Sequence, residues 1–325
     1  MVEDLNVSHI KRCFTVFVLS LFISNTIYAA SNNKVTNGRL EPEYTDPVTG
    51  MEFVLVQGGS YEMGDTFGDG EIDELPVHEV IIDDFYIGKY EVTNSQFRRF
   101  VLETGYKTSA ENVGKGYAVS KEGADDRGLK SGVNWMHPLW PYDNIAKKLD
   151  HPVLQVSWFD AVQFIRWLNR KSGKKFRLPT EAQWEYAARD RGKQNKYTWS
   201  NGKPDDNISD ESVKKFREYK YWEIWDGYND GYVYTSPVGK FKPNGLGIYD
   251  MAGNVSEWCH DLYDGEYYKK NNSKDNPEGP QIGNAHVVRG GSWNYKPFYL
   301  RNANRIFVLP DNWSYYLGFR LVMEP

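Results

Sequence analysis

The residue types that do chemistry in enzymes are sparse in this chain. Its histidines are spread over the sequence at His9, His78, His137, His151, His260 and His286. No two of them have the spacing of a helical zinc site, and no phosphate loop or dinucleotide fingerprint is present. Only two cysteines occur, Cys13 and Cys259, so no disulfide framework is expected. The tripeptide GGS ends at Ser60 and again at Ser292, but neither serine has the following glycine that a nucleophile elbow requires.

Two acidic stretches resemble calcium loops only superficially. They begin at Asp65 (DTFGDG) and at Asp226 (DGYNDG). Each has an aromatic residue at the third position, where an oxygen ligand belongs, and Pro76 or Pro237 at the twelfth, where an EF-hand has glutamate. These stretches are therefore not EF-hands, although irregular calcium sites built partly from backbone carbonyls remain open.

Composition narrows the class of protein. Hydrophobic residues make up 40% and charged residues 26% of the 325, which is ordinary globular usage and excludes general disorder and a multi-span membrane protein. The net charge of −5 disfavours electrostatic binding of nucleic acid. Aromatic residues reach 15%, and such rings supply much of the buried area in cores and in concave binding surfaces.

The N-terminus is typical of a secretory signal. Lys11 and Arg12 precede an apolar run at residues 14–23, and small residues follow at Ala29 and Ala30. The alternative is a membrane anchor, but the run is shorter than the roughly 20 residues that span a bilayer. We expect residues 1–29 to be removed and the protein to be exported, periplasmic or secreted. Cys13 precedes the run, so it is not placed as a lipid-anchor cysteine.

The rest of the chain predicts one domain. Residues 30–46 are expected to be a flexible lead-in and residues 47–325 a single domain. Residues 51–64 and 77–93 each indicate two short strands. Helices are predicted from Asn94 to Gly105, from Ser157 to Gly173, and after Thr180, which can form a capping box with Gln183. Beyond residue 192 only short strands with irregular connections are expected.

Several segments together resemble a known family. The most specific are RLPTEAQWEYAAR at 177–189 and NGLGIYDMAGNVSEW at 244–258, supported by VVRGGSWN at 287–294 and LGFRLV at 317–322. In this order they are similar to the formylglycine-generating enzyme family, also called the sulfatase-modifying-factor domain. The resemblance implies an α+β fold in a single domain, related to an elaborated C-type-lectin fold and low in regular secondary structure.

The resemblance also implies two structural calcium ions. The candidates for the first ion are Asn207, Ile208, Asp230 and Tyr232. The candidates for the second ion are Asp250, Met251, Gly253 and Val255. Side-chain oxygens of Asn207, Asp230 and Asp250 suit a hard cation, and the apolar positions would contribute backbone carbonyls. The alternative is that these loops are ordinary Asp and Asn turns.

The chain departs from the family where copper would bind. The family's enzymes oxidise a sulfatase cysteine to formylglycine with copper bound by two cysteines five residues apart, just beyond the GGS motif. The matching positions here are Tyr295 and Leu300, and neither side chain can replace a thiolate on Cu(I). Cys259 lies elsewhere and is expected to be a small buried residue. We therefore expect the fold to be kept and the copper chemistry to be lost.

Five residues near this stretch are candidates for a binding cleft: Ser292, Trp293, Tyr295, Arg301 and Arg305. They could offer a hydroxyl, an aromatic wall and guanidinium groups to an anionic or peptidic ligand. The alternative is that Trp293 belongs to the core and that the arginines form structural ion pairs. Glu181 and Glu185 are expected to be cap and surface groups.

Three functions remain open, and whether the protein is an enzyme is not settled by the sequence. The first is a divergent oxidative maturation enzyme acting on an exported peptide or metabolite, because some cysteine-lacking relatives are implicated in maturing a secreted siderophore. The second is a non-catalytic binding or scaffold protein of the cell envelope. The third, orthodox sulfatase activation, has the least support. The expected partner is an exported peptide, protein or small metabolite, and nucleic acid is not expected. After signal cleavage no membrane span is expected. The protein is expected to be a monomer.

Overall fold

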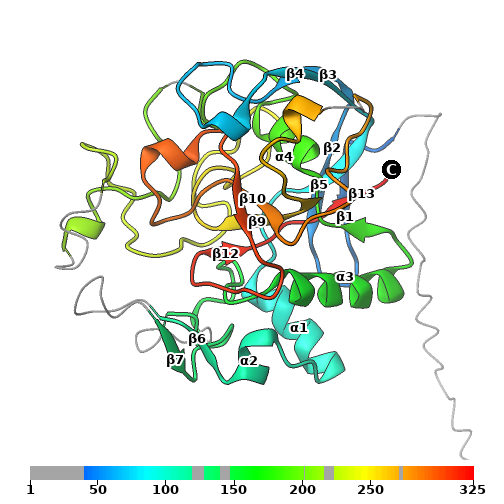
Figure 1. Ribbon diagram of the computed structural model, residues 1–325. Coiled ribbons are helices and arrows are strands. Elements are labelled where there is room, and N and C mark those ends of the chain that lie inside the picture. Colours follow the sequence, from blue (N-terminus) through cyan, green and yellow to red (C-terminus); the bar gives the residue numbers. More distant parts are fainter. Residues whose placement is uncertain (1–39, 119–127, 140–146, 201, 216–222, 271–273) are drawn as a thin grey trace, which may run out of the picture. The chain divides into compact units, whose positions relative to one another are not determined.

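Two sheets and four helices carry the candidate site, as the computed structural model in Figure 1 shows. The structure describes residues 40–118, 128–139, 147–200, 202–215, 223–270 and 274–325. All of them fall within one unit, Val35–Pro325, which agrees with a single α+β domain. The expected signal at 1–29 lies outside the described residues. Among the residues described, no helix has the length and apolarity needed to cross a membrane.

The larger sheet is antiparallel and has the order β1-β2-β5-β13-β8. Its strands are β1 (Glu43–Thr45), β2 (Glu52–Val56), β5 (Phe85–Gly88), β8 (Phe176–Arg177) and β13 (Val322–Met323). β13, near the end of the chain, therefore lies between β5, from the first third of the chain, and β8, from the middle third. Because Glu43 pairs with Val54, residues 43–45 are a strand, and the expectation of a flexible lead-in is wrong for them.

The second sheet has the order β11-β10-β9-β12, with β12 parallel to β9. Its strands are β9 (Ser256–Leu262), β10 (His286–Arg289), β11 (Ile306–Val308) and β12 (Leu317–Gly318). Two hairpins complete the described strands, β3 (Gly59–Met63) with β4 (His78–Ile82) and β6 (Lys115–Tyr117) with β7 (Leu129–Ser131). The strands predicted at 51–64 and 77–93 are β2 to β5.

Each α-helix begins at a capping box. The helices are α1 (Asn94–Thr104), α2 (Ser109–Val113), α3 (Trp158–Ser172) and α4 (Glu181–Ala188). Their N-cap hydroxyls accept from the backbone three residues on, which satisfies amides that the helix cannot pair. Gly105 and Gly173 end α1 and α3 in the left-handed conformation that glycine adopts without strain. The three predicted helices are thus confirmed, and α2 is additional.

Three apolar clusters fill the interior. The first packs α1 and α3 against the large sheet, with Phe97, Phe164 and Trp167 at its centre. The second lies between α4 and the strands β3, β4, β9 and β10, and every residue of α4 is buried. The third surrounds Trp293.

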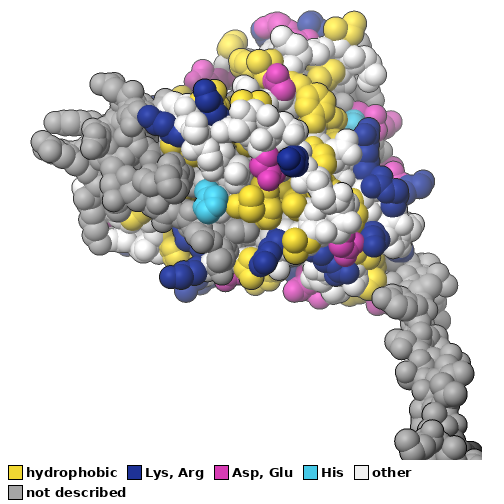
Figure 2. Space-filling view, turned by 90° about the horizontal axis from the view of Figure 1, so that it is seen from below, with side chains coloured by type: hydrophobic (Ala, Val, Ile, Leu, Met, Phe, Trp, Pro, Cys, Tyr) yellow, Lys and Arg dark blue, Asp and Glu magenta, His cyan; other side chains and the backbone are white. Residues whose placement is uncertain are grey.

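The helices are unevenly distributed over the fold. In Figure 1, α1, α2 and α3 lie at the bottom with β6 and β7, whereas α4 lies at the top below β3 and β4. The face seen from below in Figure 2 carries acidic and basic side chains interspersed with apolar ones.

Candidate functional site

Tyr295 lies between two surface clefts. Its ring centroid is 5.5 Å from that of Tyr316 and 5.7 Å from that of Tyr299. Tyr316 lines one cleft and Tyr299 lines the other. Burial raises the pKa of the Tyr295 hydroxyl well above its ordinary value, and the neighbouring Tyr316 adds to the effect. Tyr295 is therefore a neutral phenol at physiological pH.

The first cleft, which we call the tyrosine cleft, has a volume of about 470 Å³. It is lined by Tyr117, Trp313, Tyr315 and Tyr316, with Asn312 as a polar group. Trp313 donates from its indole nitrogen to the Lys115 carbonyl at 3.2 Å, which fixes one wall. Aromatic walls that also present polar groups are typical of sites for peptides and small organic ligands. Sequence reasoning missed this cleft, although the run WSYY at 313–316 is a visible signal for it.

The second cleft, the Phe307 cleft, has a volume of about 440 Å³. Phe307 stacks on Tyr263 with centroids 4.4 Å apart, and the Tyr263 hydroxyl donates to Asp73 at 2.7 Å. Phe307 keeps 57% of its surface exposed, and Ile72 keeps 69%. Apolar surface is thus available here beside carboxylates.

Ser292 and Trp293 are buried beneath the residues that line the tyrosine cleft. Ser292 is fully buried, and its hydroxyl donates to the Asn294 side chain at 2.6 Å. Trp293 is also buried, donates to the Tyr315 carbonyl at 3.3 Å and packs on Tyr234. The structure thus places Trp293 in the core, the alternative that the sequence left open.

The two candidate arginines form buried ion pairs. Arg301 makes a forked pair with Glu74, with Nη1–Oε2 at 2.6 Å and Nη2–Oε1 at 2.7 Å. Arg305 pairs with Glu181 through Nε–Oε1 at 2.8 Å and Nη2–Oε2 at 3.0 Å, with its guanidinium 4.1 Å from the Tyr268 ring centroid. Arg305 also lines the Phe307 cleft. Because a buried guanidinium needs its counter-charge, both arginines stabilise the fold through these ion pairs.

Glu181 and Glu185 belong to a chain of alternating charges. Arg189 and Arg289 both contact Glu185, and Arg289 also approaches Glu181. Glu181 and Glu185 are only 3% and 0% exposed, so the expectation that they are surface groups is wrong. The reason is that α4 is buried on all sides and its carboxylates meet arginines from distant strands and loops.

Cys259 lies on β9 with no exposed surface. Burial raises the pKa of its thiol well above the ordinary value, so the reactive thiolate is disfavoured. No second cysteine is found among the described residues, and the stretch 287–305 contains none.

The four candidates for the first calcium ion lie together. Asp230 accepts from the Ile208 amide at 3.0 Å, the Tyr232 amide at 2.6 Å and the Asn207 side chain at 3.1 Å. The Oδ1 atom of Asn207 is buried without a hydrogen-bond partner. Burial raises the pKa of Asp230 to about 7. These oxygens fit a hard cation, which would supply the missing partner and the counter-charge.

The four candidates for the second ion share one buried loop before β9. Asp250 adopts φ +57°, a left-handed conformation that Asp and Asn tolerate. Its Oδ2 accepts from the Gly239 amide at 2.6 Å, while its Oδ1 is buried with no hydrogen-bond donor other than the neighbouring Glu91 carboxyl, when that carboxyl is protonated. Burial raises the pKa of Asp250 to about 6. The pKa of Glu91 is also raised, mainly by burial and further by the negative charge of Asp250. Sequence reasoning did not identify Glu91.

Within the described ranges, no three His, Cys, Asp or Glu side chains are grouped as a metal site. Any ion in these loops would therefore depend on amide and carbonyl oxygens in addition to single carboxylates.

The chain matches the family described as "Sulfatase-modifying factor enzyme 1-like domain" over residues 40–325. It belongs to the formylglycine-generating enzyme family. It is 37% identical over 294 residues to the formylglycine-generating enzyme of Streptomyces coelicolor, covering 82% of this chain and 87% of that protein. It is 34% identical over 296 residues to the inactive C-alpha-formylglycine-generating enzyme 2 of Mus musculus, covering 82% and 84%.

Among solved structures, the chain resembles PvdO from Pseudomonas aeruginosa with a TM-score of 0.65 and 27% identity, covering 88% of this chain and all of that one. The formylglycine-generating enzyme fold is thus the fold of this protein. The family contains both proteins named as enzymes and proteins named as inactive, so membership alone does not decide whether this chain catalyses a reaction.

Proposed function

We propose that this member of the formylglycine-generating enzyme family is an exported peptide-binding protein without copper-dependent cysteine oxidation. The observation that carries the proposal is Tyr295. It stands where the resemblance implies a copper thiolate, and Leu300 stands at the second such position. A neutral buried phenol and an alkyl group do not bind Cu(I). Cys259, buried on β9, does not replace them.

Binding is supported by the two clefts that flank Tyr295. Tyr316 of the tyrosine cleft and Tyr299 of the Phe307 cleft both contact its ring. An extended peptide is the ligand that can occupy two neighbouring shallow clefts. Aromatic walls give it apolar contact at a low cost in side-chain entropy. Arg301 and Arg305 are neutralised by Glu74 and Glu181, so the site does not select a strongly anionic ligand.

Two further parts of the proposal concern compartment and metal. The basic start and apolar run at residues 11–23 support export through a signal removed near Ala29. The buried side-chain oxygens of Asn207 and Asp250 support structural calcium. Calcium would neutralise these buried carboxylates and tie their loops together, without taking part in a reaction.

The test begins with a peptide that carries the sulfatase-type cysteine motif. The purified chain is incubated with this peptide, oxygen and copper, and the peptide mass is followed beside the Streptomyces coelicolor enzyme. We expect the mass to change only with that enzyme. Conversion of the peptide by this chain would contradict the loss of cysteine oxidation.

Binding is tested on an array of random-sequence peptides. We expect the wild-type chain to retain a subset of these peptides and the Tyr316→Ala variant to lose it. A matched control is Tyr106→Phe, because Tyr106 contacts α3 away from both clefts. Identical patterns for the wild type and the Tyr316→Ala variant would contradict peptide binding in the tyrosine cleft.

A further inference from the structure

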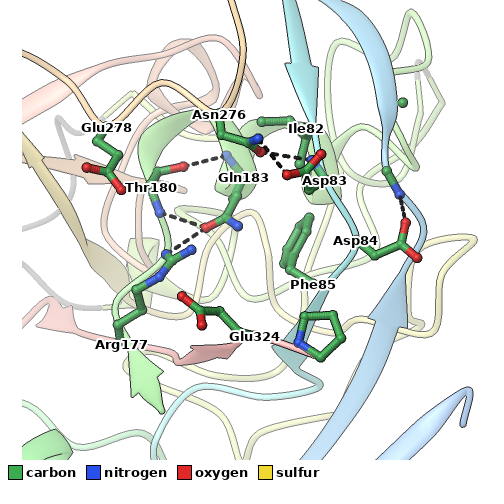
Figure 3. Close-up of a pocket in the computed structure, with 13 residues that line it drawn as sticks. Ile82, Asp83, Asp84, Phe85, Arg177, Thr180, Gln183, Asn276, Glu278 and Glu324 are labelled. Carbon is green, nitrogen blue, oxygen red and sulfur yellow. Dashed lines mark hydrogen bonds between the residues drawn. The ribbon is translucent and has the colours of Figure 1, made fainter. Parts of the chain in front are cut away.

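A third cleft lies away from Tyr295, beside the edge of the large sheet. It has a volume of about 780 Å³ and is formed by the β4–β5 turn, the β8–α4 connection, residues 276–278 and the residues after β13 (Figure 3). We call it the acidic cleft and define it by Asp83, Asp84, Arg177, Gln183, Glu278 and Glu324. In Figure 1, β13 and β8 lie on the right, whereas the 297–300 turn next to Tyr295 lies on the left.

Four carboxylates and the guanidinium of Arg177 line this cleft, and the charges of Glu278 and Glu324 act on Arg177. Glu278 makes no hydrogen bond or ion pair with another described residue, and Glu324 has only Lys175 at 3.9 Å. Asp84 uses Oδ1 to accept from the Gly58 amide at 2.7 Å, and Asp83 accepts from Asn276 at 2.8 Å. Each of these side chains therefore keeps acceptor capacity for a ligand.

Gln183 adds a donor that is held in place. Its Oε1 accepts from Arg177 at 2.8 Å and from the Thr180 amide at 3.2 Å, so the side-chain amide cannot turn freely. Its Nε2 has no partner in the part of the chain that the structure describes and reaches solvent in the cleft, although Gln183 as a whole is only 6% exposed. Figure 3 shows this nitrogen directed into the space between Phe85 and Glu324. A donor fixed in this way can hydrogen-bond a ligand that brings an acceptor into the cleft.

The spacing of the carboxylates argues against a metal ion. Throughout the described ranges, no three acidic, histidine or cysteine side chains are close enough to share one ion. The acids surround a volume suited to an organic ligand rather than to a single cation. A ligand for this cleft therefore combines positive charge with a carbonyl acceptor and some length.

We propose that the acidic cleft binds a basic peptide segment, with an Arg or Lys side chain among the carboxylates and a main-chain carbonyl on Gln183 Nε2. The buried ring of Phe85 forms an apolar floor against which the methylene groups of such a side chain can pack. This site is separate from the clefts around Tyr295, and the proposal does not depend on the function proposed for them.

The experiment titrates the full chain with acetyl-Ala-Arg-Ala-amide by isothermal calorimetry. The matched peptide acetyl-Ala-Gln-Ala-amide lacks the charge, and free arginine lacks the peptide amides. We expect the Arg peptide to bind at least roughly tenfold more tightly than the Gln peptide or free arginine. Its affinity should fall as the salt concentration rises from about 50 to about 300 mM, because salt screens exposed charges. Equal binding of free arginine would contradict recognition of the peptide main chain.

Two exposed residues provide the variants. Glu278→Gln with Glu324→Gln removes two charges from the cleft without touching a buried group, and roughly tenfold weaker binding is expected. Glu62→Gln on β3 is the control, because Glu62 is exposed, outside the cleft and equally charged. Unchanged affinity in the double variant, or an equal loss in Glu62→Gln, would overturn the proposal.

Discussion

The rings of Tyr295 and Tyr316 pack at 44° with their centroids 5.5 Å apart, so that Tyr295 backs the wall of the tyrosine cleft. Tyr299, which lines the Phe307 cleft, also contacts Tyr295, with the ring centroids 5.7 Å apart. A phenol therefore stands at one of the two positions where the family resemblance implies a thiolate. This relationship favours binding over copper chemistry and leads to the predictions below.

The first prediction concerns the pair Arg301–Glu74. Replacing Glu74 with Ala leaves a buried guanidinium without its counter-charge, which we expect to lower the free energy of unfolding by about 3–5 kcal/mol. Urea unfolding measures the loss. The exposed pair Lys269–Glu266 is the control, and Glu266→Ala should cost less than about 1 kcal/mol. A similar effect for the two variants would show that Arg301 does not depend on Glu74.

The second prediction concerns pH. Burial raises the pKa of Asp261 to about 8, compared with about 3.9 when unfolded. The folded state therefore binds the proton more strongly, so stability is fully present below pH 4 and falls as pH rises toward and through 8. Asp261→Asn removes this contribution and retains an acceptor for the Glu181 amide. Calcium-free unfolding at pH 5, 7 and 9 should show a flatter dependence for the variant, and parallel curves would contradict it.

The third prediction concerns calcium. Saturating calcium should raise the melting temperature by about 5 °C. An ion that binds only the folded state, at a free concentration about 100 times its Kd, stabilises that state by about 2.7 kcal/mol. The shift should be larger at pH 8 than at pH 5.5, because Asp230 and Asp250, with pKa values of about 7 and 6, must lose protons to bind the ion.

Asp230→Ala should reduce the calcium shift, whereas Asp226→Ala, whose side chain is 88% exposed in the neighbouring loop, should leave it unchanged. Thermal unfolding with and without calcium makes the comparison. No calcium effect on the wild type would mean that these loops are ordinary turns.

The sequence predicts the parts of the fold that local interactions determine. The starts of α1, α3 and α4 follow from the sequence because each N-cap hydroxyl, on Thr93, Ser157 and Thr180, pairs with the residue three positions on. The pairing of β13 with β5 and β8 could not be predicted, because strands of two to four residues carry little pattern and their partners are far apart in the sequence.

The site was only partly predictable for the same reason. The family motifs locate Tyr295 and the candidate calcium loops, and the structure brings each set of calcium candidates together. The burial of Glu181 was missed because its partners Arg289 and Arg305 lie more than 100 positions away. The run WSYY at 313–316 signals an aromatic surface, but its contact with Tyr295 joins separate segments and is seen only in the folded chain.

The most direct test of the central claim is the Cu(I) content of the wild type and of the double variant Tyr295→Cys with Leu300→Cys, both loaded without oxygen and freed of excess metal. The resemblance of the 287–300 stretch to the family motif predicts copper in the double variant and none in the wild type, with each single variant as a control. Mass spectrometry of the intact proteins gives the stoichiometry. One tightly bound copper in the wild type would contradict the account.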